Sequence, residues 1–308
     1  GRRDVQIFAR NLEDNLFALH RALAAGEWRH GPYRQFVVCD PKPRQIHKAA
    51  VSDRIVHHAI ARVVEPIFER SFIFDTWSCR VGKGTRAAVE RCRKELFRVS
   101  KNETQPVWVL KCDIRKYFAN VNHGILLELI TRKIDDRPAV NLISEIINSF
   151  SAGLPLGNLT SQLFANIYLN PFDHFVKEII KPSAYLRYCD DFLLVSGDER
   201  WLKNQLLTIE NYLDRQLHLA FHPNKIHLRP WHYGIDWLGY VLFPGYCLLR
   251  PNTRRRMWRR VYAGTAAYLA GGISRKSFAA IAASYDGVLK YSRNSDDRKY
   301  LNLLVRCF

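Results

Sequence analysis

Apolar residues recur every three or four positions through several long stretches of this chain, which is the spacing of one face of an α-helix. Glycine and proline close the first of these stretches, and Ser52 precedes the second as an expected N-cap. Helices are therefore predicted over residues 4–25, 52–65, 124–150 and 201–217, and from residue 250 onward.

Shorter runs rich in β-branched and aromatic residues lie between these helices and predict strands. The prolines at 41 and 43 exclude a helix after the first strand, so we expect Lys42 and Arg44 on an extended turn. Strands are expected over residues 33–38 and 106–113, on both sides of residues 189–190, and from residue 236.

Composition and charge narrow the class of protein. The 308 residues are 47% hydrophobic, enough for a large core in two or three subdomains. A net charge of +18 points to a polyanionic partner, most simply nucleic acid. No apolar run reaches membrane-spanning length and no secretory signal is present, so we expect a soluble, cytoplasmic protein. Seven cysteines without a CxxC pair indicate reduced thiols.

Two adjacent carboxylates, Asp190 and Asp191, lie between two apolar strands in the run Tyr188-Cys189-Asp190-Asp191. Adjacent carboxylates at a tight turn repel each other, and burial would raise their pKa unless a cation compensates them. Mg²⁺ bound by carboxylates and substrate phosphates is the usual solution in polymerase sites. The pairs at 135–136 and 296–297 are expected to be ordinary exposed turns, because they have no such strands beside them.

Asp113 ends another apolar strand and runs into Ile114-Arg115-Lys116-Tyr117-Phe118. Taken alone, Asp113 could simply cap the following turn. Together with Asp190 and Asp191 it could complete a site for two Mg²⁺ ions that activate a 3′ hydroxyl and stabilise a pyrophosphate leaving group. The intervening residues leave room for the predicted helices.

Three further stretches carry weaker signals. A Gly-Lys-Gly run after Arg80 resembles a phosphate cradle, although it is no Walker loop. A Gly/Pro turn at residues 153–157 leads into a helix, where backbone amides can approach a ligand. The C-terminal 59 residues hold 13 Lys/Arg against 3 Asp/Glu, and a nucleic-acid face is the favoured interpretation of the arginine run at 254–260. A zinc site at His218, His222, His227 and His232 is disfavoured by their irregular spacing.

These blocks in this order resemble a reverse transcriptase. The resemblance rests on DIRKYFANVNH from Asp113, LPLGNLTSQ from residue 154, YCDD at 188–191, Lys225, and DWLGYVL from residue 236. It implies an α+β fold, that of a right-hand polymerase. The fingers would comprise residues 1–105 with the N-terminal helix, the palm residues 106–245 with an antiparallel sheet, part of the fingers and the motif B helix inside it, and the basic helical thumb residues 246–308.

The resemblance also implies roles for individual residues. Asp113, Asp190 and Asp191, with the backbone of Ile114, would bind two Mg²⁺ ions, and Lys225 would act as a general acid or charge stabiliser. Phe118 would exclude a 2′ hydroxyl. The remaining implied residues are Arg44, Arg80, Lys42, Lys83, Leu156, Gly157 and Gln162 for the dNTP, Trp237, Leu238 and Gly239 for the primer grip, and Arg254, Arg255, Arg256, Arg259 and Arg260 for nucleic acid.

One departure from the usual bacterial motif narrows the kind of reverse transcriptase that this chain resembles. Most bacterial reverse transcriptases carry Gln-Gly-x-x-x-Ser-Pro before this helix, whereas this chain reads Leu156-Gly157-Asn158-Leu159-Thr160-Ser161-Gln162. That variant is similar to the enzymes of diversity-generating retroelements, in which an aliphatic residue accompanies errors opposite template adenines. Leucine supplies shape but no hydrogen bond, so incorrect base pairs lose less stabilisation in the site relative to correct ones.

The resemblance implies a bacterial or phage-encoded enzyme that copies a template-repeat RNA into mutagenised cDNA. Its partners would be the RNA template, the cDNA/RNA duplex, dNTPs and a small basic accessory protein, the accessory variability determinant, in an oligomeric assembly. A retron, group II intron or phage-defence reverse transcriptase is the alternative within the class; Leu156 and Gln162 speak against the first two. A non-catalytic RNA-binding scaffold is disfavoured, because an idle site has no need of three repelling carboxylates.

Overall fold

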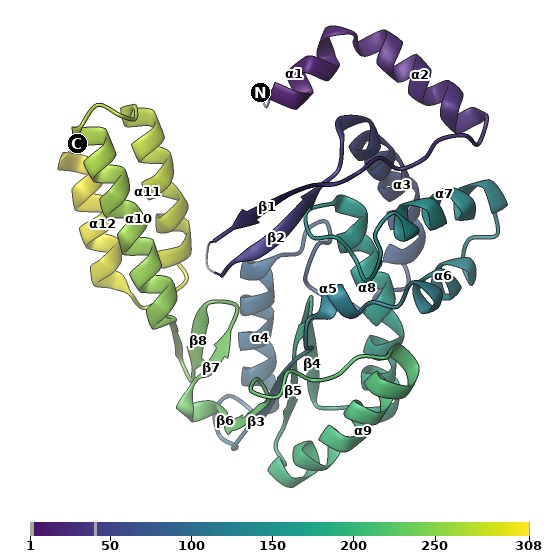
Figure 1. The fold of residues 1–308 in the computed structure, drawn as a ribbon. Coiled ribbons are helices and arrows are strands. Elements are labelled where there is room, and N and C mark those ends of the chain that lie inside the picture. Colours follow the sequence, from purple (N-terminus) through teal and green to yellow (C-terminus); the bar gives the residue numbers. More distant parts are fainter. Residues whose placement is uncertain (1–2, 40–41, 308) are drawn as a thin grey trace. The chain divides into compact units, whose positions relative to one another are not determined.

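The computed structural model describes residues 3–39 and 42–307 (Figure 1). Contacts divide the chain into two compact units, and several segments alternate between them. Strands β3 and β5 contribute residues to both. Unit 1 consists of Gly1–Gly84, Lys111–Leu193 and Asn204–Ile226, and unit 2 of Thr85–Leu110, Leu194–Lys203 and His227–Phe308.

The N-terminal helical prediction is confirmed in part, because two helices replace the single one expected. Helices α1 (Arg3–Arg10) and α2 (Leu12–Ala24) are separated at Asn11, whose φ of −123° and ψ of 51° lie outside the helical region. Asparagine competes for backbone hydrogen bonds and so interrupts helices readily. Apolar side chains of both helices remain exposed, among them Ile7 and Phe17.

A two-stranded antiparallel hairpin follows, formed by β1 (Arg34–Val38) and β2 (Arg44–Lys48). The expectation of a plain extended turn for Arg44 is therefore wrong, since Arg44 begins a strand and pairs with Val38. Lys42 is exposed just before that strand, and the neighbouring Pro41 lies outside the described residues. Phe36, Val37 and Val38 are all exposed, so the hairpin buries little apolar surface.

Helix α3 (Val51–Glu69) packs on α8 (Leu159–His174), which is buried over most of its length and continues into a π-helix, η1 (Phe175–Ile180). The expected cap at Ser52 is wrong: Ala50 holds the N-cap position without a side-chain bond, and Ser52 lies inside the helix. The other helical predictions for this half of the chain are confirmed by α6 (His123–Thr131), α7 (Arg137–Asn148) and α9 (Glu199–Leu217); the short helix α5 (Tyr117–Asn120) was not predicted.

The central sheet has four strands in the order β4-β5-β3-β6. A two-residue turn at Cys189 and Asp190 joins β4 to β5, and Cys189 has a φ of +58° there. Such a short connection requires antiparallel neighbours. The strands are β3 (Trp108–Asp113), β4 (Ala184–Tyr188), β5 (Asp191–Ser196) and β6 (His227–Pro230).

Unit 2 contains α4 (Thr85–Val99), a short 3-10 helix η2 (Trp231–Tyr233), a three-stranded meander and a three-helix bundle. The continuous strand expected from Asp236 is wrong, since Leu238 and Gly239 form a tight turn with φ of +50° and +91°. Positive φ at both central residues matches the twist of a two-residue hairpin. The meander is β7 (Ile235–Trp237), β8 (Tyr240–Phe243) and β9 (Tyr246–Leu249), and the bundle is α10 (Pro251–Leu269), α11 (Arg275–Leu289) and α12 (Ser295–Cys307).

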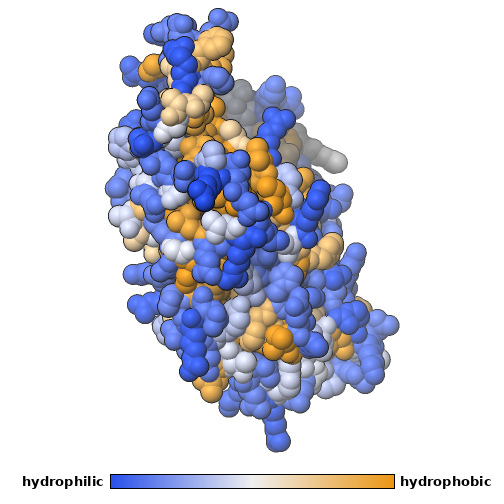
Figure 2. Space-filling view, turned by 90° about the vertical axis from the view of Figure 1, so that its right-hand side faces the viewer, coloured by the Kyte–Doolittle hydropathy of each residue, from blue (hydrophilic) through white to orange (hydrophobic). Residues whose placement is uncertain are grey.

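Figure 2 shows one face of the molecule, on which hydrophilic side chains predominate and apolar ones form scattered patches. Within residues 3–39 and 42–307, no helix is both long and apolar enough to cross a membrane. The six cysteines whose side chains are described are all free thiols, as the lack of CxxC pairs predicts.

Candidate active site

Three aspartates gather where the central sheet ends in unit 1. Asp113 is the last residue of β3, Asp191 is the first of β5, and Asp190 lies in the turn before it. Because β5 lies directly beside β3, the end of one strand meets the start of the other, and the Ile114 N–H donates to the Asp190 carbonyl over 3.1 Å. The predicted Asp-Asp hairpin is confirmed.

The negative charge of these carboxylates is only partly compensated by nearby cations. Burial and the charge of Asp113 raise the pKa of Asp190. Burial, together with the charges of Asp113 and Asp190, raises the pKa of Asp191 to about 6 against the opposing influence of Lys111. The Lys111 ammonium lies 3.9 Å from Asp191 Oδ1. Sequence reasoning missed Lys111, although a strand residue two before Asp113 must share its face.

Lys225 is the second cation of the site. Its ammonium donates to Asp113 Oδ2 over 2.7 Å. The turn that carries it is fixed to the same strand, because the His222 N–H donates to the Asp113 carbonyl over 2.8 Å. The structure therefore brings together the four residues predicted from the sequence as catalytic.

The donor set fits hard divalent cations, because carboxylate and carbonyl oxygens are the ligands that Mg²⁺ prefers. Two half-buried aspartates with a raised pKa also show a surplus of negative charge that a cation would relieve. In the part of the chain that the structure describes, no three His, Cys, Asp or Glu side chains are already arranged as a metal cage. Asp113 is instead paired with Lys225.

A buried ion pair supports the turn from behind. Arg187 of β4 is fully buried and donates to both carboxylate oxygens of Asp173, over 2.7 and 2.6 Å. Its remaining nitrogen donates to the Cys189 carbonyl over 3.0 Å, directly beside Asp190. Tyr185 also donates to Asp173. The sequence analysis did not select Arg187, although a charged residue in an otherwise apolar strand could have indicated it.

The loop before α8 is attached to the hairpin of β1 and β2. The His47 N–H donates to the Leu156 carbonyl over 2.9 Å, and the Asn158 amide donates to the His47 carbonyl over 3.1 Å. Gly157 has a φ of +116°, and a Cβ there would lie 2.7 Å from Ile46. The loop thus requires glycine for both its conformation and this close approach.

The other predicted nucleotide-binding residues lie in different surroundings. Phe118 is half-buried in α5, and Gln162 is exposed on α8. Arg80 is engaged within its own loop, because it donates to Glu69 and to the Ile73 and Thr76 carbonyls. The Lys83 ammonium donates to the Phe74 carbonyl and lies over an aromatic ring. Arg80 and Lys83 would have to exchange these partners to contact a triphosphate.

The residues predicted for the primer grip and the basic helix belong to unit 2. Trp237 is fully buried, and Leu238 and Gly239 form the β7–β8 turn. The basic run 254–260 lies in α10, as predicted. Arg254, Arg255 and Arg259 all line a cavity, and Arg254 also binds Asp297.

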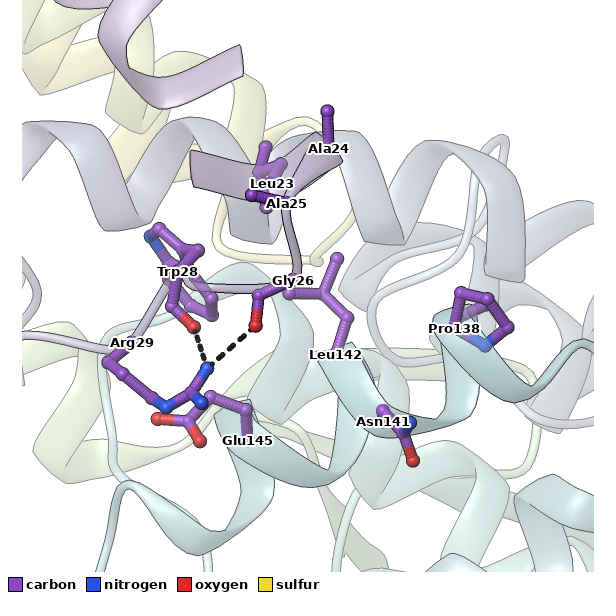
Figure 3. A pocket seen from close by; sticks show the side chains of 11 residues that line it. Leu23, Ala24, Ala25, Gly26, Trp28, Arg29, Pro138, Asn141, Leu142 and Glu145 are labelled. Carbon is purple, nitrogen blue, oxygen red and sulfur yellow. Dashed lines mark hydrogen bonds between the residues drawn. The ribbon is translucent and has the colours of Figure 1, made fainter. Parts of the chain in front are cut away.

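A separate cavity of about 760 Å³ lies in unit 1 between the end of α2 and α7 (Figure 3). The Arg29 guanidinium closes the adjoining turn by donating to the Gly26 and Trp28 carbonyls over 3.0 and 2.8 Å. The His30 N–H donates to Glu145 Oε1 and so fixes the segment to α7. None of the predicted site residues lines this cavity.

Comparison with known families agrees with the geometry. The family model for reverse transcriptase (RNA-dependent DNA polymerase) matches residues 33–242, which include all three aspartates and Lys225. The chain therefore belongs to the reverse transcriptase family, a class of RNA-directed DNA polymerases.

Two curated relatives are similar to parts of this chain. Protein YkfC of Escherichia coli K12 is 26% identical over 73% of this chain and 70% of its own length. The group II intron-encoded protein LtrA of Lactococcus lactis is 23% identical over 54% of this chain, but the match spans only 29% of LtrA. Among solved structures, apo telomerase from Candida tropicalis superposes with a TM-score of 0.59 at 12% identity, over 85% of this chain and 57% of that one, which shows a shared fold.

Proposed function

We propose that this chain copies RNA into DNA at a site in which Asp113, Asp190, Asp191 and the Ile114 carbonyl hold two Mg²⁺ ions. The observation that carries the proposal is the convergence of the three carboxylates at one end of the sheet, with burial raising the pKa of Asp190 and Asp191. Bound magnesium supplies Lewis-acid activation of a hydroxyl and stabilises charge on a leaving pyrophosphate. Magnesium would compensate the negative charge of the aspartates that the ammonium groups of Lys111 and Lys225 do not neutralise.

The protein's own side chains would orient the reactants. Lys225 can release Asp113 and place its ammonium near the phosphates of an incoming nucleotide, where it would donate a proton or stabilise charge. Phe118 would lie beneath the deoxyribose and exclude a 2′ hydroxyl. Lys42 and Arg44 are exposed on the fingers hairpin and are better placed to meet a triphosphate than the engaged Arg80 and Lys83.

We further propose that the copying is error-prone opposite template adenine, as in a diversity-generating retroelement. The supporting residues are Leu156 and Gln162, which replace the glutamine and proline usual in bacterial relatives. Leu156 is half-buried, and its carbonyl is held by His47. The side chain at this position can therefore change while the backbone stays in place. A side chain that offers shape without hydrogen bonding would lower discrimination between correct and incorrect base pairs.

The corresponding partners would be a template-repeat RNA, its cDNA duplex, dNTPs and a small basic accessory protein. The accessory protein would assemble with the polymerase into an oligomer. Exposed basic residues and the exposed apolar helices α1 and α2 offer surfaces for such an assembly.

An intron-type or phage-defence retroelement enzyme is the second candidate. The similarity to LtrA, a group II intron-encoded protein, favours this reading within the same class. The two candidates differ in the errors that they predict, because only the first requires misincorporation confined to adenine.

Sequencing of cDNA made by the purified chain on a defined RNA tests both the proposed catalytic site and the proposed mutagenic copying. Asp190→Asn should give no product, whereas Leu156→Gln should retain synthesis and reduce errors opposite adenine. Leu156→Met is the matched control, because methionine also offers shape without a strong hydrogen bond and should keep the errors. Accurate synthesis by the unsubstituted chain would refute the mutagenic proposal and favour the second candidate; full activity of Asp190→Asn would refute the assigned site.

A further inference from the structure

Unit 2 contains a cavity of about 910 Å³ between helices α10 and α12, at the end of β9. Its wall on α10 is one helical face, since the lining residues recur every three or four positions from Pro251 to Tyr262. Asp296, Asp297 and Tyr300 form the opposite wall on α12. The volume lies within the range of small-molecule sites, which is roughly 300 to 1,000 Å³.

The floor of the cavity is a buried carboxylate. The expectation that Asp296-Asp297 is an ordinary exposed turn is wrong, because both residues lie in the first turn of α12 and Asp297 is only 7% exposed. Asp297 accepts hydrogen bonds from Arg254, from the Trp258 indole over 3.0 Å and from Asn294. Burial would raise the pKa of Asp297, but these donors outweigh it and hold the pKa below its ordinary value. The carboxylate therefore fixes the edge of the Trp258 ring.

Three aromatic rings line the cavity. Trp258 stacks on Tyr262 at a centroid distance of 5.6 Å with 29° between the planes, and Tyr300 lies 5.3 Å from Trp258. Tyr262 and Tyr300 are 52% and 44% exposed, so part of each ring remains open to a ligand. Aromatic faces held in place but left exposed are suited to stacking with a planar group.

Arginines beside these rings supply positive charge. Arg255 and Arg259 are exposed, line the cavity and form no ion pair among the residues that the structure describes. Arg254 instead supports Asp297. The remaining lining charge is Asp296, a fully exposed carboxylate whose nearest cation is Lys299 at 3.8 Å.

From this geometry we infer that the cavity binds an unpaired nucleotide of single-stranded RNA, in a role that rests on the proposed copying of RNA. The base stacks on the Tyr262 and Trp258 rings, and Arg255 and Arg259 contact the flanking phosphates. Asp296 accepts a hydrogen bond from the ribose 2′ hydroxyl, the group by which proteins distinguish RNA from DNA. A base pair inside a duplex cannot take this position, because its faces are covered by its neighbours.

The test is a binding titration without nucleotides, using labelled oligouridine, oligodeoxyuridine of equal length and a blunt RNA–DNA hybrid. Tyr262→Leu should weaken oligouridine binding about tenfold, because it removes a stacking face, whereas Tyr262→Phe should not. The double variant Arg255→Gln/Arg259→Gln should lower the salt dependence of oligouridine binding by about 0.7 per lost contact. The matched control Arg275→Gln/Lys276→Gln removes the same charge from exposed positions of α11, outside the cavity, and should leave that slope unchanged.

Affinity of all Tyr262 variants for the hybrid should remain equal to that of the unsubstituted chain. Equal losses on hybrid and oligouridine, or no loss on either, would overturn the assignment of an unpaired base. Oligodeoxyuridine that binds as tightly as oligouridine would overturn the role of Asp296. An acidic peptide that competes as well as oligouridine would assign the cavity to a protein partner instead.

Primer extension measured separately keeps this inference distinct from the proposed function. Asp190→Asn should lose extension and keep full oligouridine binding, because its carboxylate belongs to unit 1 and not to this cavity. If the unsubstituted chain binds oligouridine through Tyr262 but extends no primer, the inference stands and the proposed function fails.

Discussion

Replacing Asp191 by asparagine should abolish DNA synthesis and, at the same time, stabilise the metal-free protein. The folded chain holds the pKa of Asp191 at about 6 instead of the ordinary 3.8, with burial as the main cause. This difference corresponds to about 3 kcal/mol of folding free energy lost at neutral pH, at about 1.4 kcal/mol for each tenfold change in proton affinity. The repulsion is shared among Asp191, Asp190 and Asp113, so removal of one charge recovers all or only part of this energy. We therefore expect the free energy of unfolding of Asp191→Asn to rise by about 1 to 3 kcal/mol.

The sign of the pH dependence follows from the raised pKa. Below pH 3.8 the carboxyl is protonated in both folded and unfolded chains, so it costs no stability. Between pH 3.8 and about 6 the unfolded chain ionises first and the cost grows; above about 6 the cost is complete. The gain of the variant should therefore be full at pH 7.5 and about half as large near pH 5.

Urea denaturation in EDTA at these two pH values measures the effect. Asp135→Asn is the matched control, because Asp135 is exposed and the same chemical change should alter stability by less than about 0.5 kcal/mol. Added Mg²⁺ should stabilise the unsubstituted chain and leave Asp191→Asn largely unchanged. A variant that is less stable than the unsubstituted chain at pH 7.5 without metal would refute the reasoning from surplus charge.

Three further substitutions test other parts of the site. Lys225→Gln should slow single-turnover incorporation by about 10² to 10⁴, as expected for loss of a general acid, and an unchanged rate would exclude that role. Phe118→Ala should admit ribonucleotides, which competition between rNTP and dNTP in primer extension measures; unaltered sugar selectivity would contradict its proposed position. Arg187→Met should cost about 3 to 5 kcal/mol in urea denaturation, because it leaves the Asp173 carboxylate buried and unpaired, and a loss below about 1 kcal/mol would contradict this account.

Local pattern was sufficient to predict much of this protein. Apolar spacing predicted most helices, and an Asp-Asp pair between two apolar strands predicted the hairpin that carries the site. The order of Asp113, the YCDD run and Lys225 predicted the reverse transcriptase family, because the chemistry of the site is carried by residue types at characteristic positions.

Tertiary structure decided what depends on neighbours distant in the chain. The sequence offered signals for Lys111 and Arg187, but only the packing of the strands and of α8 shows that Lys111 lies beside Asp191 and that Arg187 binds Asp173. Arg80 has the sequence context of a phosphate ligand, yet Glu69 and two carbonyls bind it. Asp297 resembles a solvated turn residue until α10 places Arg254 and Trp258 against it. Sequence determines which groups the chain offers, whereas their partners, burial and pKa follow from the packing of elements that are remote in sequence.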